Sequence, residues 1–161
     1  MALDDRDHAL VELGRALKAS SYEFVTVTPE THRHVLSRDA QPGRDLRDVF
    51  GWSRAFDPGV LPTPIRTIGE RASVFMKEQS GLFRATVRFS SLGEHLLVHS
   101  AFPTLSSDSV FFGPDTYRFC SFLKRCGLPG GRVVDVGCGT GAGGILASQA
   151  CLLYTSPSPR D

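Results

Sequence analysis

The chain has 161 residues, of which 41% are hydrophobic and 22% are charged, and its formal net charge is +1. This length accommodates one domain, or a small domain and part of a second. A net charge so close to zero gives no electrostatic argument for a nucleic-acid or membrane partner, and no segment approaches the ~20 apolar residues that span a bilayer. The N-terminal stretch MALDDRDHALVEL is acidic where a secretory signal is basic, so we expect a cytoplasmic protein.

The cysteines and histidines predict neither disulfides nor a metal site. The four cysteines have no paired close spacing and no histidine partners at the distances typical of zinc sites: Cys120, Cys126, Cys138 and Cys151. His95 and His99 stand in a segment with strand character, where they would lie ~13 Å apart as ordinary strand positions.

Three helices are predicted in the first half of the chain. Residues 3–19 have leucines at helical spacing and acidic residues at the N-terminal end. A second helix follows Thr28 as N-cap, with Pro29 in its first turn, and a third covers 44–53 until a proline-rich stretch breaks it. Residues 1–80 are therefore expected to form a mostly helical N-terminal domain.

A β-hairpin is predicted next, with strands over 82–90 and 94–99. The alternation puts four apolar side chains on one face: Phe83, Ala85, Val87 and Phe89. Arg84 and Arg88 fall on the other face. That face is expected either to be solvated or to meet a phosphate backbone.

A further helix is expected to start at Pro114, because proline suits a first helical turn, and to end at the sequence GLPGG. Asp115 and Thr116 would stabilise its N-terminus through capping and the helix dipole. This helix includes an apolar stripe: Tyr117, Phe119, Phe122 and Leu123.

The stretch RVVDVGCGTGAGGILAS carries the strongest functional pattern. Its valines predict a short buried strand: Val133, Val134 and Val136. Three spaced glycines then predict a turn against which an anionic or polar ligand can lie, at the free N–H groups of a new helix: Gly137, Gly139 and Gly141. A turn without a ligand stays open as an alternative. So does a dinucleotide site, since Gly137, Gly139 and Ala142 satisfy G-x-G-x-x-G/A. Asp135, two residues before the first glycine, favours a cationic amino group over a pyrophosphate.

VVDVGCGTG resembles motif I of the class I S-adenosylmethionine (SAM) methyltransferases. In that family an acid at this place helps to hold the methionine moiety, and the glycines pass under the cofactor. The resemblance therefore implies that SAM is bound by Asp135 and by the turn that follows it: Gly137, Cys138, Gly139 and Gly141.

The residues before motif I sharpen the resemblance. The helical domain, the hairpin and the segment FFGPDTYRF are similar to the release-factor glutamine methyltransferases and the related small-domain methyltransferases of ribosomal RNA. Pro114, Asp115 and Thr116 match a Pro-Asp-Thr element of the glutamine enzymes, which implies a place beside the active site. The runs RDVFGWSRAF, HSAFPT and VFFGPDTYRF look more like an uncharacterised bacterial branch of the group, and the resemblance covers residues 40–150.

The catalytic element of that group is not found in this sequence. The family uses an Asn-Pro-Pro-Tyr loop whose Asn side chain orients the target nitrogen, and the chain contains no asparagine. The resemblance thus implies no catalytic residue here. The last residues, CLLYTSPSPRD, abandon the preceding helix pattern and resemble a translated sequencing adapter, so we expect residues 151–161 to be a non-native tail.

Together these patterns predict an α/β chain. We expect an N-terminal helical recognition domain (1–80), then a β-hairpin and the truncated start of a Rossmann-like SAM methyltransferase domain (81–150). The parent enzyme would be bacterial and would methylate an amide or exocyclic amine nitrogen of protein glutamine or ribosomal RNA, while the fragment itself would be inactive. A fragment of an NAD(P)-dependent oxidoreductase and a non-enzymatic RNA- or protein-binding module are the alternatives.

Overall fold

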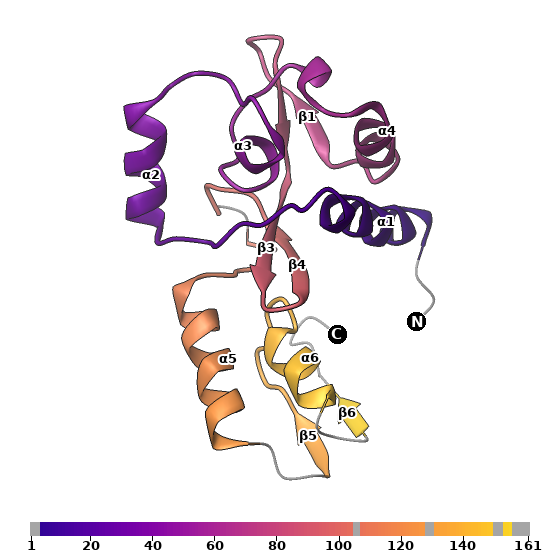
Figure 1. Ribbon diagram of the computed structural model, residues 1–161, viewed down its shortest axis with the longest axis vertical. Coiled ribbons are helices and arrows are strands. Elements are labelled where there is room, and N and C mark those ends of the chain that lie inside the picture. Colours follow the sequence, from indigo (N-terminus) through magenta and orange to yellow (C-terminus); the bar gives the residue numbers. More distant parts are fainter. Residues whose placement is uncertain (1–3, 105–106, 128–130, 150–152, 156–161) are drawn as a thin grey trace. The chain divides into compact units, whose positions relative to one another are not determined.

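The computed structural model describes residues 4–104, 107–127, 131–149 and 153–155. The chain forms two compact units, Met1–Ser109 and Val110–Asp161 (Figure 1). Both contain helices and strands, so the expected mixture of the two is confirmed. None of the helices in these ranges has the length and apolar character that a membrane crossing requires.

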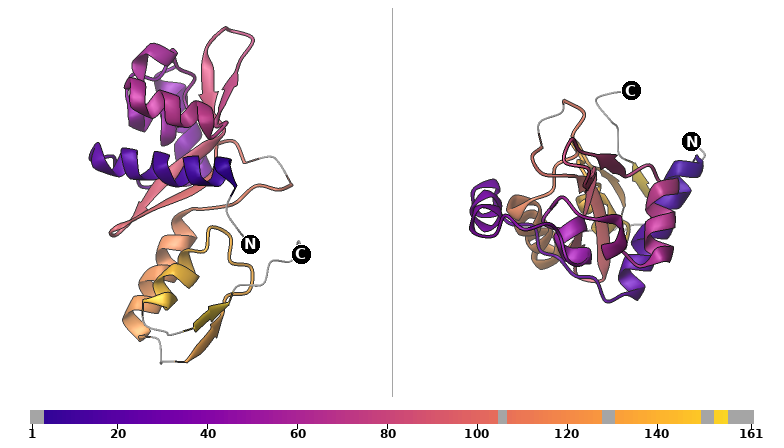
Figure 2. Two further views of the ribbon diagram at one scale, coloured as in Figure 1. Left: turned by 90° about the vertical axis from the view of Figure 1, so that its right-hand side faces the viewer. Right: turned by 90° about the horizontal axis from the view of Figure 1, so that it is seen from above.

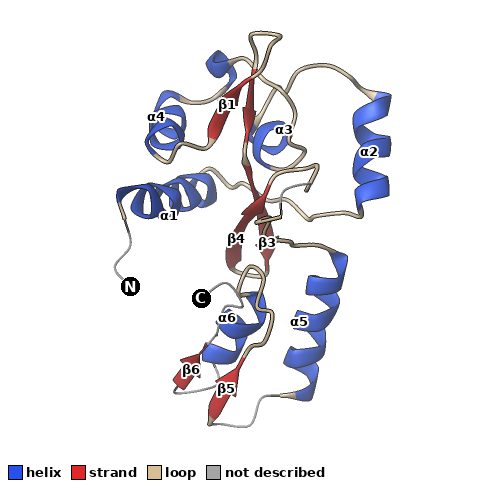
Figure 3. Cartoon of the chain, turned by 180° about the vertical axis from the view of Figure 1, so that it is seen from behind, coloured by secondary structure: helices blue, strands red, loops and turns tan. Residues whose placement is uncertain are grey.

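The first unit combines short helices with two antiparallel strand pairs (Figure 3). Strand β1 pairs with β2, and β3 pairs with β4. Its elements are α1 (Asp5–Ala19), α2 (Pro29–Arg38), α3 (Leu46–Phe50), the 3-10 helix η1 (Pro58–Val60), α4 (Thr63–Arg71), β1 (Phe75–Lys77), β2 (Phe83–Ala85), β3 (Val87–Leu92) and β4 (His95–Ser100).

Side-chain caps start the first three helices, all of which were predicted. The Asp4 carboxylate accepts the N–H of Asp7 at 2.7 Å at the start of α1. Thr28 Oγ1 accepts the Thr31 N–H at 3.2 Å at the start of α2, and Asp45 caps α3 in the same way. Each cap supplies an acceptor to an N–H group that has no partner inside its helix.

The proline-rich stretch 55–65, expected only to break a helix, also starts new ones. It contains η1 and the first turn of α4, where the missing N–H of Pro64 costs no helical hydrogen bond. Helix α4 packs beside α1 (Figure 2). A Cβ at Gly69 of α4 would lie 2.5 Å from the ring of Phe75, so only glycine allows this strand and helix to pack so closely.

Helices α1 and α4 end in the same unusual way. Ser21 and Ser73 follow them with φ of 55° and 52°, a left-handed conformation that glycine or asparagine usually adopts. The next residues, Tyr22 and Val74, each donate an N–H back to a carbonyl in the last turn of the helix at 3.1 Å. Both ends are therefore Schellman motifs with serine in the strained position.

Residues 82–90 complete the core of the first unit, but as two strands instead of the one predicted: β2 pairs with β1, and only β3 pairs with β4 in the predicted hairpin. Ala85 and Phe89 are buried in that core, and Phe83 and Val87 pack against it, so the predicted apolar face is confirmed. Helices α1, α3 and α4 supply much of the remaining core: Ala9, Leu13, Leu17, Val49, Phe50 and Ile65. The hairpin therefore belongs with the helical segment, and the chain divides after Ser109 rather than at the expected residue 80.

The second face of residues 82–90 is solvated only in part. Arg88 is buried, its Nε donates to the Ser100 carbonyl at 3.3 Å, and its Nη1 lies 3.4 Å from Nδ1 of His32 on α2. Both interpretations of Arg88, as a solvated or a phosphate-facing cation, are wrong because its guanidinium is buried against His32 and the Ser100 carbonyl. Arg84 is half-buried and pairs with Glu78 at 2.5 Å.

The second unit contains α5 (Pro114–Cys126), β5 (Arg132–Val134), α6 (Ala142–Ser148) and β6 (Leu153–Thr155). β5 and β6 are parallel. The predicted burial of the valine strand is wrong, because Val134 is 58% and Val136 is 84% exposed. β5 ends at Val134, before Val136, and within the described residues it pairs only with β6, which leaves its other edge unpaired. Leu3, most of GLPGG and the tail other than β6 lie outside the described residues.

Candidate cofactor-binding site

The glycine turn between β5 and α6 has the backbone that the sequence predicts. Gly137, Gly139 and Gly141 have φ of 74°, 53° and 72°, in the left-handed region that other L residues rarely adopt. The Gly141 N–H donates to the Cys138 carbonyl at 2.8 Å, and the Gly141 carbonyl accepts the N–H of Ile145 at 2.8 Å. The turn therefore leads directly into the first turn of α6.

The outer side of this turn is open. Apart from its chain neighbours, a Cβ added at Gly137 or Gly141 would meet no atom of the described residues within 4 Å, and one at Gly139 would meet the Phe111 carbonyl at 3.5 Å. The glycines are thus required by their backbone angles and not by protein packing around the turn. The space beside them is available to a ligand that lies against the backbone.

Asp135 follows β5, and its carboxylate reaches the beginning of α6. Oδ2 accepts the N–H of Gly144 at 3.1 Å, and the residue is half-buried. A carboxylate is favoured there because the first N–H groups of a helix lack helical partners and lie at the positive end of its dipole. This contact holds the Asp135 carboxylate between the strand end and the helix, where a ligand on the turn would meet it.

Gly143 was not singled out from the sequence, but packing requires it. A Cβ at this position would lie 2.8 Å from the Phe119 ring and 3.1 Å from Asp135 Oδ2. The Phe119 ring, on α5, and the Asp135 carboxylate therefore both fill the space beside this glycine. The sequence signal for this role is the pair Gly143 and Gly144 in the first turn of a short helix, where glycine is unfavourable.

The Pro-Asp-Thr element forms the start of α5. Thr116 Oγ1 accepts the N–H of Gly113 at 3.3 Å, and Pro114 stands in the first turn. Asp115 pairs with Arg118 at 2.9 Å, with both side chains largely exposed. The geometry gives Thr116 a capping role and gives Asp115 a surface ion pair. Phe112, buried just before the helix, packs edge-on against Tyr117 at a ring distance of 5.0 Å.

The cysteines of the described residues are free thiols. Cys120 is buried on α5, and burial is the main cause that raises the pKa of its thiol, with the charge of Asp135 adding to the effect. It therefore stays protonated and is a poor nucleophile. Cys138 lies half-buried within the glycine turn.

A serine–histidine pair in the first unit has the spacing of a catalytic dyad, but its hydroxyl is not accessible to a substrate. Ser90 Oγ lies 2.7 Å from His99 Nε2, and Thr26 Oγ1 also contacts the serine. Both Ser90 and His99 are buried, at 0% and 3% exposure. No substrate reaches the hydroxyl, so the pair serves to satisfy buried polar atoms.

Metal-binding geometry is not found among the described residues, in which no three His, Cys, Asp or Glu side chains gather around a common point. His95 is the first residue of β4 and His99 is the last but one, so both are strand positions.

Comparison with known proteins gave no assignment: no protein-family model matches the chain, and no curated protein matches its sequence significantly.

Proposed function

We propose that residues 110–149 form the cofactor-binding start of a cytoplasmic SAM-dependent methyltransferase with a Rossmann-like catalytic domain. The observation that carries the proposal is the turn at the carboxyl end of β5, with three left-handed glycines, an open outer side and the Asp135 carboxylate beside it. Ligands of parallel α/β folds bind at this end of the strands.

These residues fit SAM by their chemistry. The exposed backbone of Gly137, Cys138 and Gly139 would accommodate the cofactor, and the Asp135 carboxylate would attract the ammonium group of its methionine part. A dinucleotide brings a pyrophosphate to this place, which a fixed carboxylate repels. SAM would supply an activated methyl group, and the residues of this chain would bind and orient the molecule that carries it.

The acceptor would be an amide or exocyclic amine nitrogen of protein glutamine or ribosomal RNA, with the first unit contributing to its recognition. This part of the proposal depends on the resemblance described above. The chain has no asparagine, so the side chain that would orient the acceptor is not among its residues. We therefore expect these 161 residues to bind cofactor without transferring methyl groups. Methyl transfer by the purified chain would contradict this expectation.

Ligand-observed NMR on the purified chain tests the cofactor. S-adenosylhomocysteine, SAM and NAD are titrated separately, and the first two are expected to bind. Asp135→Asn should weaken their binding by about tenfold or more, because a charge-assisted contact contributes ~1.5–3 kcal/mol. Glu12→Gln, the same carboxylate-to-amide change on the exposed surface of α1, should leave binding unchanged.

Binding of NAD in preference to SAM would support the oxidoreductase alternative and contradict the proposal. Equal affinity of the wild type and Asp135→Asn would also contradict it. An independent test reads the gene beyond codon 150, where an Asn-Pro-Pro-Tyr segment is expected within about 100 residues.

A further inference from the structure

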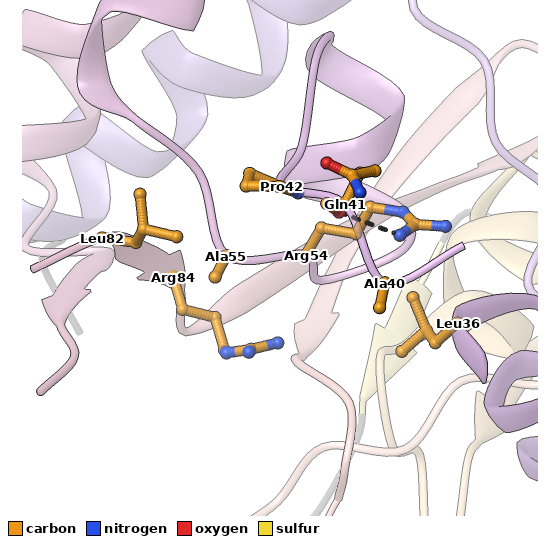
Figure 4. Close-up of a pocket in the computed structure, with 8 residues that line it drawn as sticks. All are labelled: Leu36, Ala40, Gln41, Pro42, Arg54, Ala55, Leu82 and Arg84. Atoms are coloured by element: carbon orange, nitrogen blue, oxygen red, sulfur yellow. Dashed lines mark hydrogen bonds between the residues drawn. The ribbon is translucent and has the colours of Figure 1, made fainter. Parts of the chain in front are cut away.

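We propose that a cavity in the first unit binds a small organic acid, a carboxylate attached to a compact apolar body. The cavity has a volume of about 190 Å³. Its walls come from four parts of the chain: the end of α2, the segment 40–42, residues 54–55 after α3, and β2 with the residue before it (Figure 4). This site uses none of the residues of the glycine turn.

The apolar part of the wall sets the size of the ligand. It is formed by Leu36, Ala40, Pro42, Ala55 and Leu82. A protein cavity of about 150 Å³ takes up benzene, so this volume holds an acid with a body of about that size. An ion without an apolar body would leave these side chains in contact with water.

Arg54 supplies a buried cationic donor to the cavity. Its side chain is 7% exposed. Nη1 donates to the carbonyls of Asp39 and Gln41, and Nε lies 3.3 Å from Asp48 Oδ1. Nε is fully buried and has no hydrogen-bond partner within the described residues, and the hydrogen bonds of this guanidinium there are both made by Nη1. The guanidinium is thus held rigid by three contacts, with Nη2 left for a ligand.

Arg84 supplies the second donor from β2. Nε donates to Glu78 Oε1 at 2.5 Å, and Nη1 donates to the Ser53 carbonyl. In the described part of the chain its Nη2 also has no acceptor. Figure 4 shows the Arg54 and Arg84 side chains extending toward the side of the cavity where Leu36 and Ala40 lie.

Carboxylate is the acceptor that this arrangement favours. Guanidinium groups bind carboxylates through planar, charge-assisted hydrogen bonds, and both groups here are already oriented by protein contacts. Asp48 and Glu78 balance the two charges, so the cavity offers directed donors without a strong positive potential. Directed donors beside an apolar wall suit an amphipathic acid better than inorganic phosphate.

The first experiment records amide NMR spectra of the intact chain with three probes: benzoate, neutral benzamide and inorganic phosphate. Benzoate is expected to shift the amide signals of Ala40 and Ala55, while the other two leave them unchanged. Benzamide binding as tightly as benzoate, phosphate binding in its place, or no shift with benzoate up to about 10 mM would each overturn the proposal. This measurement needs only the wild-type chain, so it holds even where a variant fails to fold.

Two substitutions with opposite effects sharpen the test. Arg84→Gln should weaken benzoate binding at least about tenfold, because it removes a charged donor. Glu78→Gln should strengthen binding several-fold, because it removes a negative charge beside the guanidinium while an amide oxygen can still accept from Arg84 Nε. Arg66→Gln, on the surface of α4, is the matched control and should have no effect. Arg84→Gln binding as tightly as wild type, or Glu78→Gln binding more weakly, would overturn the proposal. Neither result bears on SAM binding, which involves other residues.

Discussion

Acid should unfold the first unit at an unusually high pH, because two buried histidines must remain neutral in the folded state. His32 is 1% and His99 is 3% exposed. Burial is the largest cause that lowers the pKa of His32 to about 4 and the pKa of His99 to about 3, and the nearby charge of Arg88 lowers both further. His32 also stacks on Phe102 at a ring distance of 4.2 Å, contacts the Trp52 carbonyl through Nε2 and lies 3.4 Å from Arg88 Nη1 through Nδ1. None of these groups is a carboxylate that would favour protonation.

The magnitude follows from proton uptake by the unfolded chain. Above the unperturbed pKa of 6.5 both histidines are neutral in the folded and unfolded states, and their contribution to stability is constant. Below it the unfolded chain binds protons that the folded chain does not, so the free energy of unfolding falls by about 1.4 kcal/mol per pH unit and per histidine. At about pH 5 the two together lower it by ~4 kcal/mol, a large part of the ~5–15 kcal/mol of a typical domain. The fall continues until the folded-state pKa values are reached.

Urea unfolding at about pH 7.5, 6 and 5 measures this slope. Far-UV circular dichroism and the fluorescence of Trp52, the one tryptophan of the chain, report on the transition. His32→Gln and His99→Gln should each remove about half of the slope. His34→Gln, at an exposed position of the same helix as His32, should leave it unchanged. A flat profile from pH 7 to 5 in the wild type, or a full slope in both buried-site variants, would refute the reasoning.

Three further substitutions test the packing described above. Ser73→Gly should raise the free energy of unfolding by about 0.5–1 kcal/mol in urea titrations, because it removes a Cβ from a left-handed position; a loss of stability would contradict the strain. Gly69→Ala should lower it by ~1–3 kcal/mol although alanine favours helices, because the new Cβ would lie 2.5 Å from an aromatic ring. Gly143→Ala places a Cβ 3.1 Å from Asp135 Oδ2 and should speed hydrogen exchange of the Gly144 amide and weaken SAM binding, whereas unchanged exchange would argue against that contact.

Features that depend on a few neighbouring residues were predictable from the sequence. Thr28 caps α2 because a hydroxyl followed by proline and a helical pattern is sufficient to start a helix. The turn at Gly137, Gly139 and Gly141 was predictable for the same reason, since only glycine adopts those angles at low cost. The assignment of a cofactor to that turn remains a prediction.

Features that depend on distant segments were not predictable. The buried Arg88 contacts His32, which lies more than fifty residues earlier in the sequence, and alternation within a strand carries no information on that contact. The exposure of Val134 has the opposite origin, because an apolar strand is buried only where other elements cover it, and Val136 lies beyond the end of β5. Gly143 shows its role only when Phe119 is placed beside it.

The serines that end α1 and α4 also affect the chemical stability of the protein over time. Asparagine is the usual alternative to glycine in a left-handed position, but it is among the thermolabile residues. Ser21 and Ser73 adopt that conformation with a side chain that cannot deamidate, and the chain contains no asparagine. These two helix ends are therefore conformationally strained but chemically durable, and Ser73→Asn would relieve the strain while adding a site for slow covalent damage.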